Sequence, residues 1–323
     1  MKLKTLVFVL SIILALYIVL DIESLGINGF VVKEKPIPKE NGSIAVYFCP
    51  RDGCEQILAG EIMNSGQVMC ALYDLNLEKV KTALKSKNAD VLIDEDNYEG
   101  YGQEISGSGL MHNKFCIFDN KKIFTGSFNP TERDAYKNNN NLLIIESKYL
   151  SENYINEFYE LKNLGKNARN INEKIIFNGF LVENYFCPDD DCEANVLKIL
   201  NTAGSSVYFM TFSFTSDPIG DFLISKKDSI DIKGVFEKSQ NNDWTEYSKM
   251  KDAGMDVVFD GNSANMHHKV FIIDNETVIT GSYNPSNNGN KNNDENILII
   301  HDRTIAAEFI EEFERVWKEA QNQ

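Results

Sequence analysis

Residues His267 to Asn284 read HHKVFIIDNETVITGSYN, and residues His112 to Asn129 read HNKFCIFDNKKIFTGSFN. Both stretches have the spacing H-x-K-x4-D-x6-G-S-x-N. Six residue types, each at an ordinary usage of about 5%, fall into such a spacing by chance at roughly one in 10^8 starting positions. Two copies in one chain therefore indicate an internal duplication. The fixed residues are His112, Lys114, Asp119, Gly126, Ser127 and Asn129 in the first copy and His267, Lys269, Asp274, Gly281, Ser282 and Asn284 in the second.

Each copy predicts a pair of short strands that presents polar side chains to one ligand. Apolar residues such as Val, Ile and Phe follow each histidine, which is typical of a strand, so His and Lys two residues apart lie on the same face. After a turn at Asp119 or Asp274, a second strand leads into Gly-Ser-x-Asn, where small residues allow the backbone to come close to a ligand. A histidine that can attack or carry a proton, a fixed cation and short donors suit a phosphoryl group. The two aspartates stand at strand ends, where we expect them to support the turn rather than take part in chemistry.

The two motifs resemble the HKD signature of the phospholipase D superfamily, and the chain resembles a member that carries both motifs. The resemblance extends over nearly everything from residue 44 onward. It implies an α/β fold of two duplicated phospholipase D-like lobes, each a mixed sheet flanked by helices, with one active site at the lobe interface. It also implies a phosphodiesterase without metal or other cofactor. In that reaction one histidine forms a phosphohistidine, and the other protonates the leaving group and then activates water.

The resemblance also implies roles for the motif residues. Ser127 and Ser282 are expected to bind the substrate phosphate, and Gly126 and Gly281, with Asp119 and Asp274, to support the motif. The residues expected to be catalytic are His112, Lys114, Asn129, His267, Lys269, Asn284 and, from outside the motifs, Glu295.

The two copies differ at Glu295, which lies eleven residues after Asn284, because the same step from Asn129 reaches Asn140. Relatives commonly have a carboxylate at this position that hydrogen-bonds the motif histidine, and such a bond orients the ring and raises its basicity. Only the second copy supplies this carboxylate. On this physical ground the sequence favours His267 as the nucleophile, although in many two-motif relatives the first histidine attacks.

A second repeat marks the beginning of each lobe. VYFCPRDGCE at 46–55 matches NYFCPDDDCE at 184–193 with an offset of 138, whereas the motifs are offset by 155, so the second lobe has about 17 extra residues ahead of its motif. Strands and helices alternate throughout, which favours a mixed sheet covered by helices in each lobe. We expect the first lobe at 44–161, a connection at 162–181 and the second lobe at 182–323.

Residues 1–20 differ in composition from the lobes. Lys2 and Lys4 precede an uncharged run from Thr5 to Leu20, which as a helix is about 24 Å long and close to the thickness of a bilayer core. We interpret this run as a single membrane anchor, with a cleaved signal peptide as the alternative. The preceding lysines place the lobes outside the cytoplasm, and cleavage would make the protein secreted. Residues 21–43, which contain several Gly and Pro, are expected to form a tether.

The six cysteines include two C-x4-C pairs, Cys49 with Cys54 and Cys187 with Cys192. In an exported chain we expect each pair to form a local disulfide. A four-thiolate zinc site and free thiols are the alternatives. Cys70 and Cys116 lie on predicted strands and are expected to be small core residues.

The composition bounds the function. Hydrophobic content of 43% and charged content of 25% are those of a globular protein, and a net charge of -16 argues against broad binding to nucleic acid. We expect a phospholipase D-type hydrolase that acts as a monomer on phospholipid headgroups at a membrane. The alternatives are an exported endonuclease with nucleic acid as substrate, then a phosphatidyltransferase similar to cardiolipin synthase, and a non-catalytic scaffold.

Overall fold

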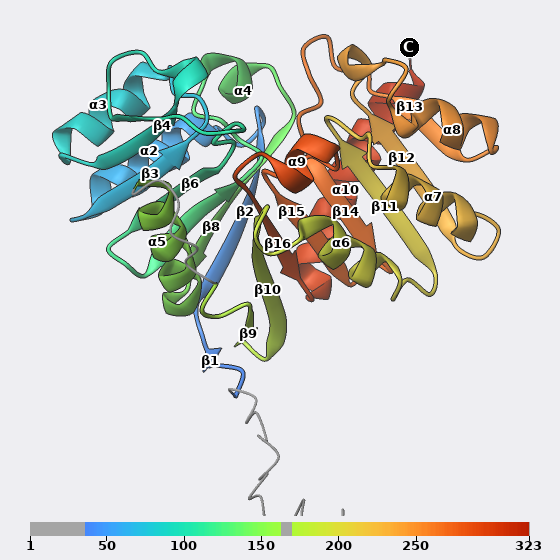
Figure 1. Ribbon diagram of the computed structural model, residues 1–323, viewed down its shortest axis with the longest axis horizontal. Helices are drawn as coiled ribbons and strands as arrows, with labels where there is room; N and C mark the ends of the chain where they lie inside the picture. The colour runs from blue at the N-terminus through green and yellow to red at the C-terminus, as the bar shows by residue number, and fades with distance from the viewer. Residues whose placement is uncertain (1–35, 163–169, 323) are drawn as a thin grey trace, which may run out of the picture. The chain divides into compact units, whose positions relative to one another are not determined.

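Two mixed β-sheets form the centre of the fold, one in each lobe (Figure 1). The computed structural model describes residues 36–162 and 170–322. The proposed anchor at 1–20 and most of the proposed tether lie outside these ranges. None of the helices within them is sufficiently long and apolar to cross a membrane.

The first sheet has the strand order β2-β8-β7-β6-β3-β4-β5. The pairs β3–β4 and β4–β5 are parallel and the other pairs are antiparallel. The strands are β2 (Ser43–Cys49), β3 (Val68–Leu72), β4 (Asp90–Asp94), β5 (Gln103–Ile105), β6 (Lys114–Phe118), β7 (Lys122–Gly126) and β8 (Asn140–Glu146). The helices of this lobe are α2 (Cys54–Asn64), α3 (Glu78–Ser86), η1 (Glu95–Asn97), α4 (Glu132–Tyr136) and α5 (Lys148–Lys162).

The second sheet repeats this order as β10-β16-β15-β14-β11-β12-β13 and continues beyond β10 with β9 and β1. Its strands are β1 (Lys39–Glu40), β9 (Lys174–Phe177), β10 (Phe180–Cys187), β11 (Ser206–Thr211), β12 (Asp231–Phe236), β13 (Asp256–Phe259), β14 (Lys269–Ile273), β15 (Thr277–Gly281) and β16 (Glu295–Ile300). The helices are α6 (Cys192–Leu200), α7 (Asp217–Lys226), η2 (Lys238–Gln240), α8 (Glu246–Asp252), α9 (Asn287–Lys291) and α10 (Arg303–Gln321). The α/β fold of two duplicated mixed sheets flanked by helices is therefore confirmed.

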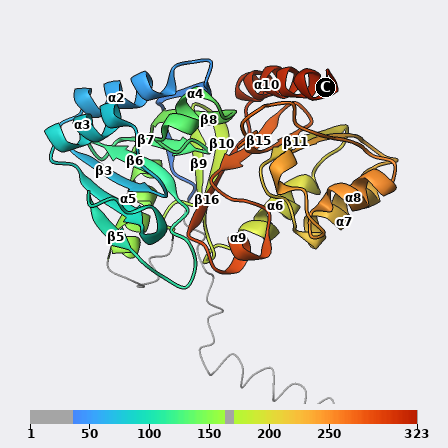
Figure 2. The same ribbon diagram turned by 90° about the horizontal axis from the view of Figure 1, so that it is seen from above.

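Helices cover both faces of each sheet. In Figure 2, α2 and α3 lie on one face of the first sheet and α5 on the other, while α10 and the group α6, α7 and α8 lie on opposite faces of the second. One apolar core is shared by the two lobes, because side chains of α5 and α10 pack in it together with residues of both sheets. The extra residues of the second lobe include α8, which connects β12 to β13 in the chain, and these two strands are neighbours in the sheet.

Two segments outside the expected lobes add strands to the second sheet. Lys39–Glu40, at the end of the expected tether, forms β1 and pairs in parallel with β9 of the second sheet. Strand β9 itself lies within the expected connection and pairs with β10. Both segments therefore contribute to the second sheet.

All six cysteines lie within the described ranges and form disulfides. The bonds Cys49–Cys54 and Cys187–Cys192 confirm the predicted local pairs and leave no thiolates for the zinc alternative. The prediction of unpaired core cysteines was wrong, because Cys70 and Cys116 form a third disulfide. These two residues lie opposite each other on the antiparallel strands β3 and β6, with Cα atoms 4.0 Å apart.

Candidate active site

Each sequence motif forms a β-hairpin, β6–β7 in the first lobe and β14–β15 in the second. The turn residues Asp119 and Asp274 have φ angles of 52° and 53°, a region in which Asp and Asn are better tolerated than most residues. The Asp119 carboxylate accepts hydrogen bonds from the N–H groups of Gly66 and Gln67, at 2.9 and 2.8 Å. The Asp274 carboxylate accepts bonds from Gly204 and the two residues after it. Both aspartates thus bind backbone at the end of the hairpin that is distant from the motif histidine.

The residue before each motif histidine pairs with the opposite lobe. Met111 forms an isolated β-bridge with Asp294, and Met266 forms one with Asn139. The Met111 N–H also donates to the Asp94 carboxylate at 2.8 Å, as the Met266 N–H does to a glutamate, Glu237, at 2.6 Å. These bridges bring the two motifs together in one site between the lobes.

The bridges decide which side chains hold the histidines. His112 Nδ1 lies 2.8 Å from Glu295 Oε2, and His267 Nδ1 lies 2.8 Å from Asn140 Oδ1. The expectation that Glu295 holds His267 was wrong. Met111 and Asp294 pair in parallel, so the residues that follow them, His112 and Glu295, lie side by side. The carboxylate of the second lobe therefore meets the histidine of the first. A carboxylate bonded to the ring was the reason for favouring His267 as the nucleophile. Because the carboxylate binds His112 instead, this reason now favours His112.

Each histidine and its lysine pack against one aromatic ring. The His112 ring meets Tyr73 edge-on at 4.8 Å between centroids, and Lys114 Nζ lies 4.8 Å from the same ring centroid. In the second lobe Phe212 has this position, 4.7 Å from His267 and 5.0 Å from Lys269 Nζ. The two aromatic residues directly follow β3 and β11, and this shared position is the signal by which the sequence could have identified them.

Both lysines are held beside their histidines. Lys114 Nζ donates to the carbonyl oxygen of His112 at 2.7 Å, and Lys269 Nζ donates to that of His267 at 2.9 Å. All four side chains are buried. As expected for residues two apart on a strand, His and Lys of each motif face the same region.

Burial and mutual repulsion of the cations favour the neutral forms of these groups. Burial lowers the pKa of His112 to about 4 despite the opposing effect of Glu295, and Lys114 adds to the lowering. Burial, then Lys269 and Lys114, lower the pKa of His267 well below its usual value. Burial also lowers the pKa of Lys114 to about 8. An anion between the two motifs would offset this repulsion, so the site is suited to bind a phosphate.

The motif serines and glycines connect the hairpins to the neighbouring strands. Ser127 and Ser282 are fully buried, and their Oγ atoms each accept a hydrogen bond at 3.0 Å, from the N–H groups of Asn141 and Asn296. A Cβ added to Gly281 would lie 2.2 Å from the carbonyl oxygen of Asn296, so only glycine fits there. Gly126 is in the same situation next to Asn141. Contact of the two serines with a phosphate stays a prediction.

The motif asparagines are in different surroundings in the two lobes. The N–H and Nδ2 groups of Asn129 both donate to Asp134 Oδ2, at 2.8 and 2.9 Å. The position equivalent to Asp134 in the second lobe, at the offset of 155, is Gly289. The Oδ1 atoms of Asn129 and Asn284 are buried without a hydrogen-bond partner among the described residues.

Polar side chains behind the histidines form a duplicated network across the interface. Asn296 Nδ2 donates to Asn113 Oδ1 at 2.7 Å, and Asn113 Nδ2 donates to Glu157 at 2.9 Å. The equivalent residues Asn141, His268 and Glu312 make the corresponding contacts. These pairs share the offset of 155, which could have identified them in the sequence.

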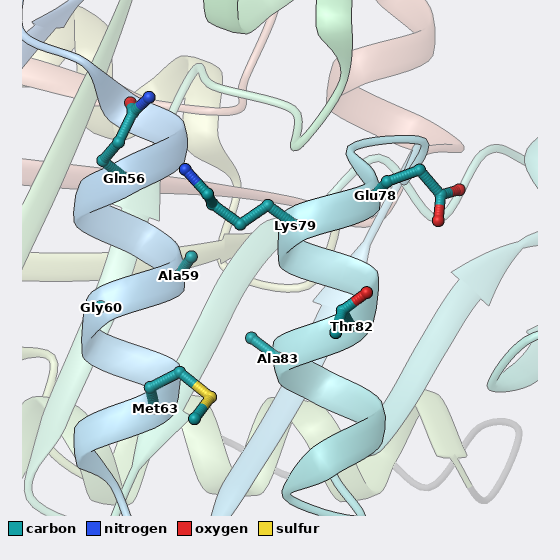
Figure 3. Close-up of a pocket in the computed structure, with 8 residues that line it drawn as sticks. All are labelled: Gln56, Ala59, Gly60, Met63, Glu78, Lys79, Thr82 and Ala83. Atoms are coloured by element: carbon teal, nitrogen blue, oxygen red, sulfur yellow. The ribbon is translucent and has the colours of Figure 1, made fainter.

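A polar pocket of 790 Å³ lies in the second lobe, and no motif residue lines it. Its lining includes Ser213, next to Phe212, and Ser286, two residues after Asn284. Trp244, which is 80% exposed, stands at this pocket in the segment before α8. A separate groove of 550 Å³ between α2 and α3 (Figure 3) has no motif residue in its lining.

Comparisons with known proteins agree on one family. Residues 45–162 and 196–317 match the family model described as the PLD-like domain of cardiolipin synthase. The chain is 27% identical over 172 residues to a phospholipase D of Rickettsia prowazekii, which covers 52% of this chain and 82% of that protein. It is 30% identical over 128 residues to the mitochondrial cardiolipin hydrolase of Mus musculus, covering 39% of this chain and 58% of that protein.

The arrangement of both lobes also occurs in a solved structure. The phosphatidylserine synthase of Haemophilus influenzae superposes with a TM-score of 0.62 over 84% of this chain and 86% of that chain. The sequences are 11% identical, so this likeness concerns the fold alone.

Proposed function

Because the chain belongs to the phospholipase D superfamily, we propose that it is a phosphodiesterase that hydrolyses phospholipid headgroup esters through a phosphohistidine on His112. The observation that carries the proposal is the pairing of each motif histidine with a side chain of the other lobe. The pairing brings a nucleophile, a proton donor and two cations into one site without a further group. We further propose, as the family resemblance implies, that the reaction needs no metal.

His112 is the better nucleophile of the two histidines. Its Nδ1–H donates to the Glu295 carboxylate, which leaves the Nε2 lone pair free and stabilises the positive charge that develops on the ring. His267 has a neutral amide, that of Asn140, at the same position. We therefore assign the attack to His112 and the proton transfers to His267.

The first step forms one bond and breaks one. Nε2 of His112 attacks phosphorus, and the P–O bond to the headgroup alcohol breaks as His267 gives its proton to the leaving oxygen. Lys114 and Lys269 stabilise the negative charge on the phosphoryl oxygens. In the second step His267 takes a proton from water, the hydroxide attacks phosphorus, and the P–N bond breaks to release phosphatidic acid and free His112.

Three observations support a phospholipid as substrate. The relatives that the chain resembles are named as a phospholipase D and a cardiolipin hydrolase. The net charge of -16 disfavours broad binding to nucleic acid. The pocket whose lining includes Ser213, the residue after Phe212, would offer room for one organic arm of a phosphodiester.

We also propose that the lobes act as a monomer outside the cytoplasm, anchored by residues 1–20. Both motifs come from the same chain, so one copy supplies the whole site. Disulfides persist in oxidising compartments, and this chain has three. Release of the protein from membranes by a carbonate wash would refute the anchor.

The test of the activity uses the full chain in EDTA with phospholipid vesicles and, in parallel, with single-stranded and double-stranded DNA. We expect headgroup release that His112→Ala abolishes, and a phosphohistidine trapped by acid quench on the peptide that contains His112. Cleavage of DNA without hydrolysis of the lipid would mean that the protein is a nuclease and not a phospholipase. Label on the His267 peptide would reverse the two roles.

A further inference from the structure

The two histidines of the site differ in the charge of their partners. Glu295 brings a carboxylate to 2.8 Å from His112, whereas Asn140 brings a neutral amide oxygen to the same distance from His267. An amide oxygen can orient an imidazole ring, but it does not balance the charge of an imidazolium in a buried site. His267 therefore needs another anion if it is to hold a proton.

Asp134 brings a carboxylate to His267 from a different position. It lies in α4, is 3% exposed, and has its Oδ2 atom 3.6 Å from His267 Nδ1. Oδ2 accepts bonds from the N–H and Nδ2 groups of Asn129, and Oδ1 accepts one from Asn138 Nδ2 at 2.6 Å. Three buried donors of the first lobe thus bind this one carboxylate and fix its position next to the His267 ring.

The second lobe has no counterpart of this side chain. Gly289 stands at the equivalent position in α9, and a Cβ added there would lie 2.3 Å from the carbonyl oxygen of Asn284. Each lobe therefore supplies one carboxylate to the histidine of the other lobe, but from different positions. The second lobe uses Glu295 and the first lobe uses Asp134.

We propose that Asp134 is the positioning residue of His267. It supplies the negative charge that Glu295 supplies to His112 and that the neutral Asn140 does not. This inference rests on the proposed function, because it concerns the step in which His267 gives its proton to the leaving oxygen. At 3.6 Å Asp134 acts through its charge and through Asn129 and Asn138, whereas the direct bond to His267 comes from Asn140. A carboxylate at this distance stabilises the protonated ring and leaves its proton free to move.

The cations around His267 act in the opposite direction, whereas Glu237, bound by the Met266 N–H, is a further carboxylate near this motif. Burial, followed by the charges of Lys269, Lys114, His112 and His268, lowers the pKa of His267. The ring is also packed against Phe212, which carries no charge. A negative charge at Asp134 and a bound phosphate both oppose these effects.

The first test measures the protonation of His267 directly. The full chain has four histidines, so histidine-labelled protein can be titrated by NMR in saturating inorganic phosphate. Asp134→Asn should lower the pKa of His267 by about one unit or more, with a smaller change at His112. Asn140→Asp should raise it. Glu132→Gln is the matched control, because it removes an exposed charge from the same helix and should leave His267 unchanged.

The second test separates a role in proton transfer from a role in folding. Asp134→Asn should lower kcat about 10-fold to 100-fold on an alkyl phosphodiester, with little loss on a nitrophenyl ester, whose leaving group needs no proton. Adding Asn140→Asp to Asp134→Asn should restore most of the kcat on the alkyl phosphodiester, because it returns a carboxylate to His267. An unmoved His267 pKa, or equal losses on both substrates without rescue, would overturn the proposal. If the wild type hydrolyses neither substrate, the proposed function fails, and the NMR titration alone decides the pairing.

Discussion

Single positions at which the two lobes differ give the two histidines unlike surroundings. The motifs are the same in His, Lys, Ser and Asn, yet His112 faces Glu295 and His267 faces Asn140. The flanking rings differ too, since Tyr73 stands where the second lobe has Phe212. A duplicated fold with a near-symmetric site thus offers two unlike histidines, which fits the proposed roles of nucleophile for His112 and proton carrier for His267.

The pH dependence of kcat/KM tests the partner of His112. Burial lowers the pKa of His112 to about 4 against the effect of Glu295, so the neutral ring that attacks is present above this pH. The acid limb of kcat/KM should therefore lie near pH 4, well below that of an ordinary histidine. Glu295→Gln removes a charge that raises this pKa, so the limb should move to lower pH while kcat falls about 10^2-fold to 10^4-fold. A limb that moves to higher pH would contradict the pairing.

At the scale of elements, the closing helices α5 and α10 carry equivalent buried carboxylates in opposite surroundings. Glu157 is buried with acidic neighbours, and burial followed by Asp294 raises its pKa well above the usual value. Burial also disfavours the charge of Glu312, but bonds from Arg315 and His268 outweigh it and lower the pKa to about 2. One carboxylate is therefore an unfavourable anion at neutral pH, and the other belongs to an ion-pair cluster.

This difference predicts opposite effects of the same substitution. A raised folded pKa means that Glu157 destabilises the fold increasingly as the pH rises above the unfolded value. Glu157→Gln keeps an acceptor for Asn113 Nδ2 and should raise Tm, with the gain growing from pH 5 to pH 8. Glu312→Gln removes the anion that Arg315 and His268 share, although Arg315 keeps its ion pair with Glu319, and should cost about 3 kcal/mol. Thermal unfolding of both variants between these pH values is the measurement, and equal shifts would contradict the difference.

The hairpins need glycine where they meet the next strand, whereas the glycine within α2 has room for a larger side chain. Gly281→Ala should destabilise the protein by about 3 kcal/mol, because φ is 144° and the new Cβ would lie 2.2 Å from a backbone oxygen of Asn296. Gly60, within α2, has no atom within 4 Å of an added Cβ. Gly60→Ala should therefore stabilise by about 0.5–1 kcal/mol. Denaturant unfolding compares the two, and a loss at Gly60 as large as that at Gly281 would refute the packing explanation.

At the scale of the whole molecule, the two lobes share one apolar core and one polar site. Side chains of both sheets, α5 and α10 belong to the same buried cluster, and strand β1 pairs with the second sheet before the chain enters the first. The charges of the site come equally from both lobes, and the repulsion between Lys114 and Lys269 crosses the interface. A bound anion should therefore stabilise both lobes together.

Inorganic phosphate tests this coupling. At a concentration 100 times its Kd, phosphate should raise the free energy of unfolding by about 2.7 kcal/mol, as one cooperative transition seen by calorimetry. Lys114→Ala removes a cation of the site and should abolish most of the gain, and chloride at equal ionic strength is the control for screening. A phosphate effect that persists unchanged in the variant would mean that the anion binds elsewhere.

The sequence by itself determined the family, the duplicated α/β fold and the motif histidines and lysines of the site. Repeats at 138 and 155 residues carry this information, because strand periodicity and fixed spacing are local properties of a chain. The two C-x4-C disulfides were predictable for the same reason. Only the tertiary structure decided which groups pair across the lobes.

The bridges Met111 with Asp294 and Asn139 with Met266 join residues that are more than a hundred positions apart, and they give Glu295 to His112 rather than to His267. Likewise, the disulfide between Cys70 and Cys116 depends on the register of β3 with β6, and the approach of Asp134 to His267 depends on the packing of α4 against the other lobe's motif. Contacts of this kind follow from how strands and lobes pack, which local periodicity and spacing do not encode.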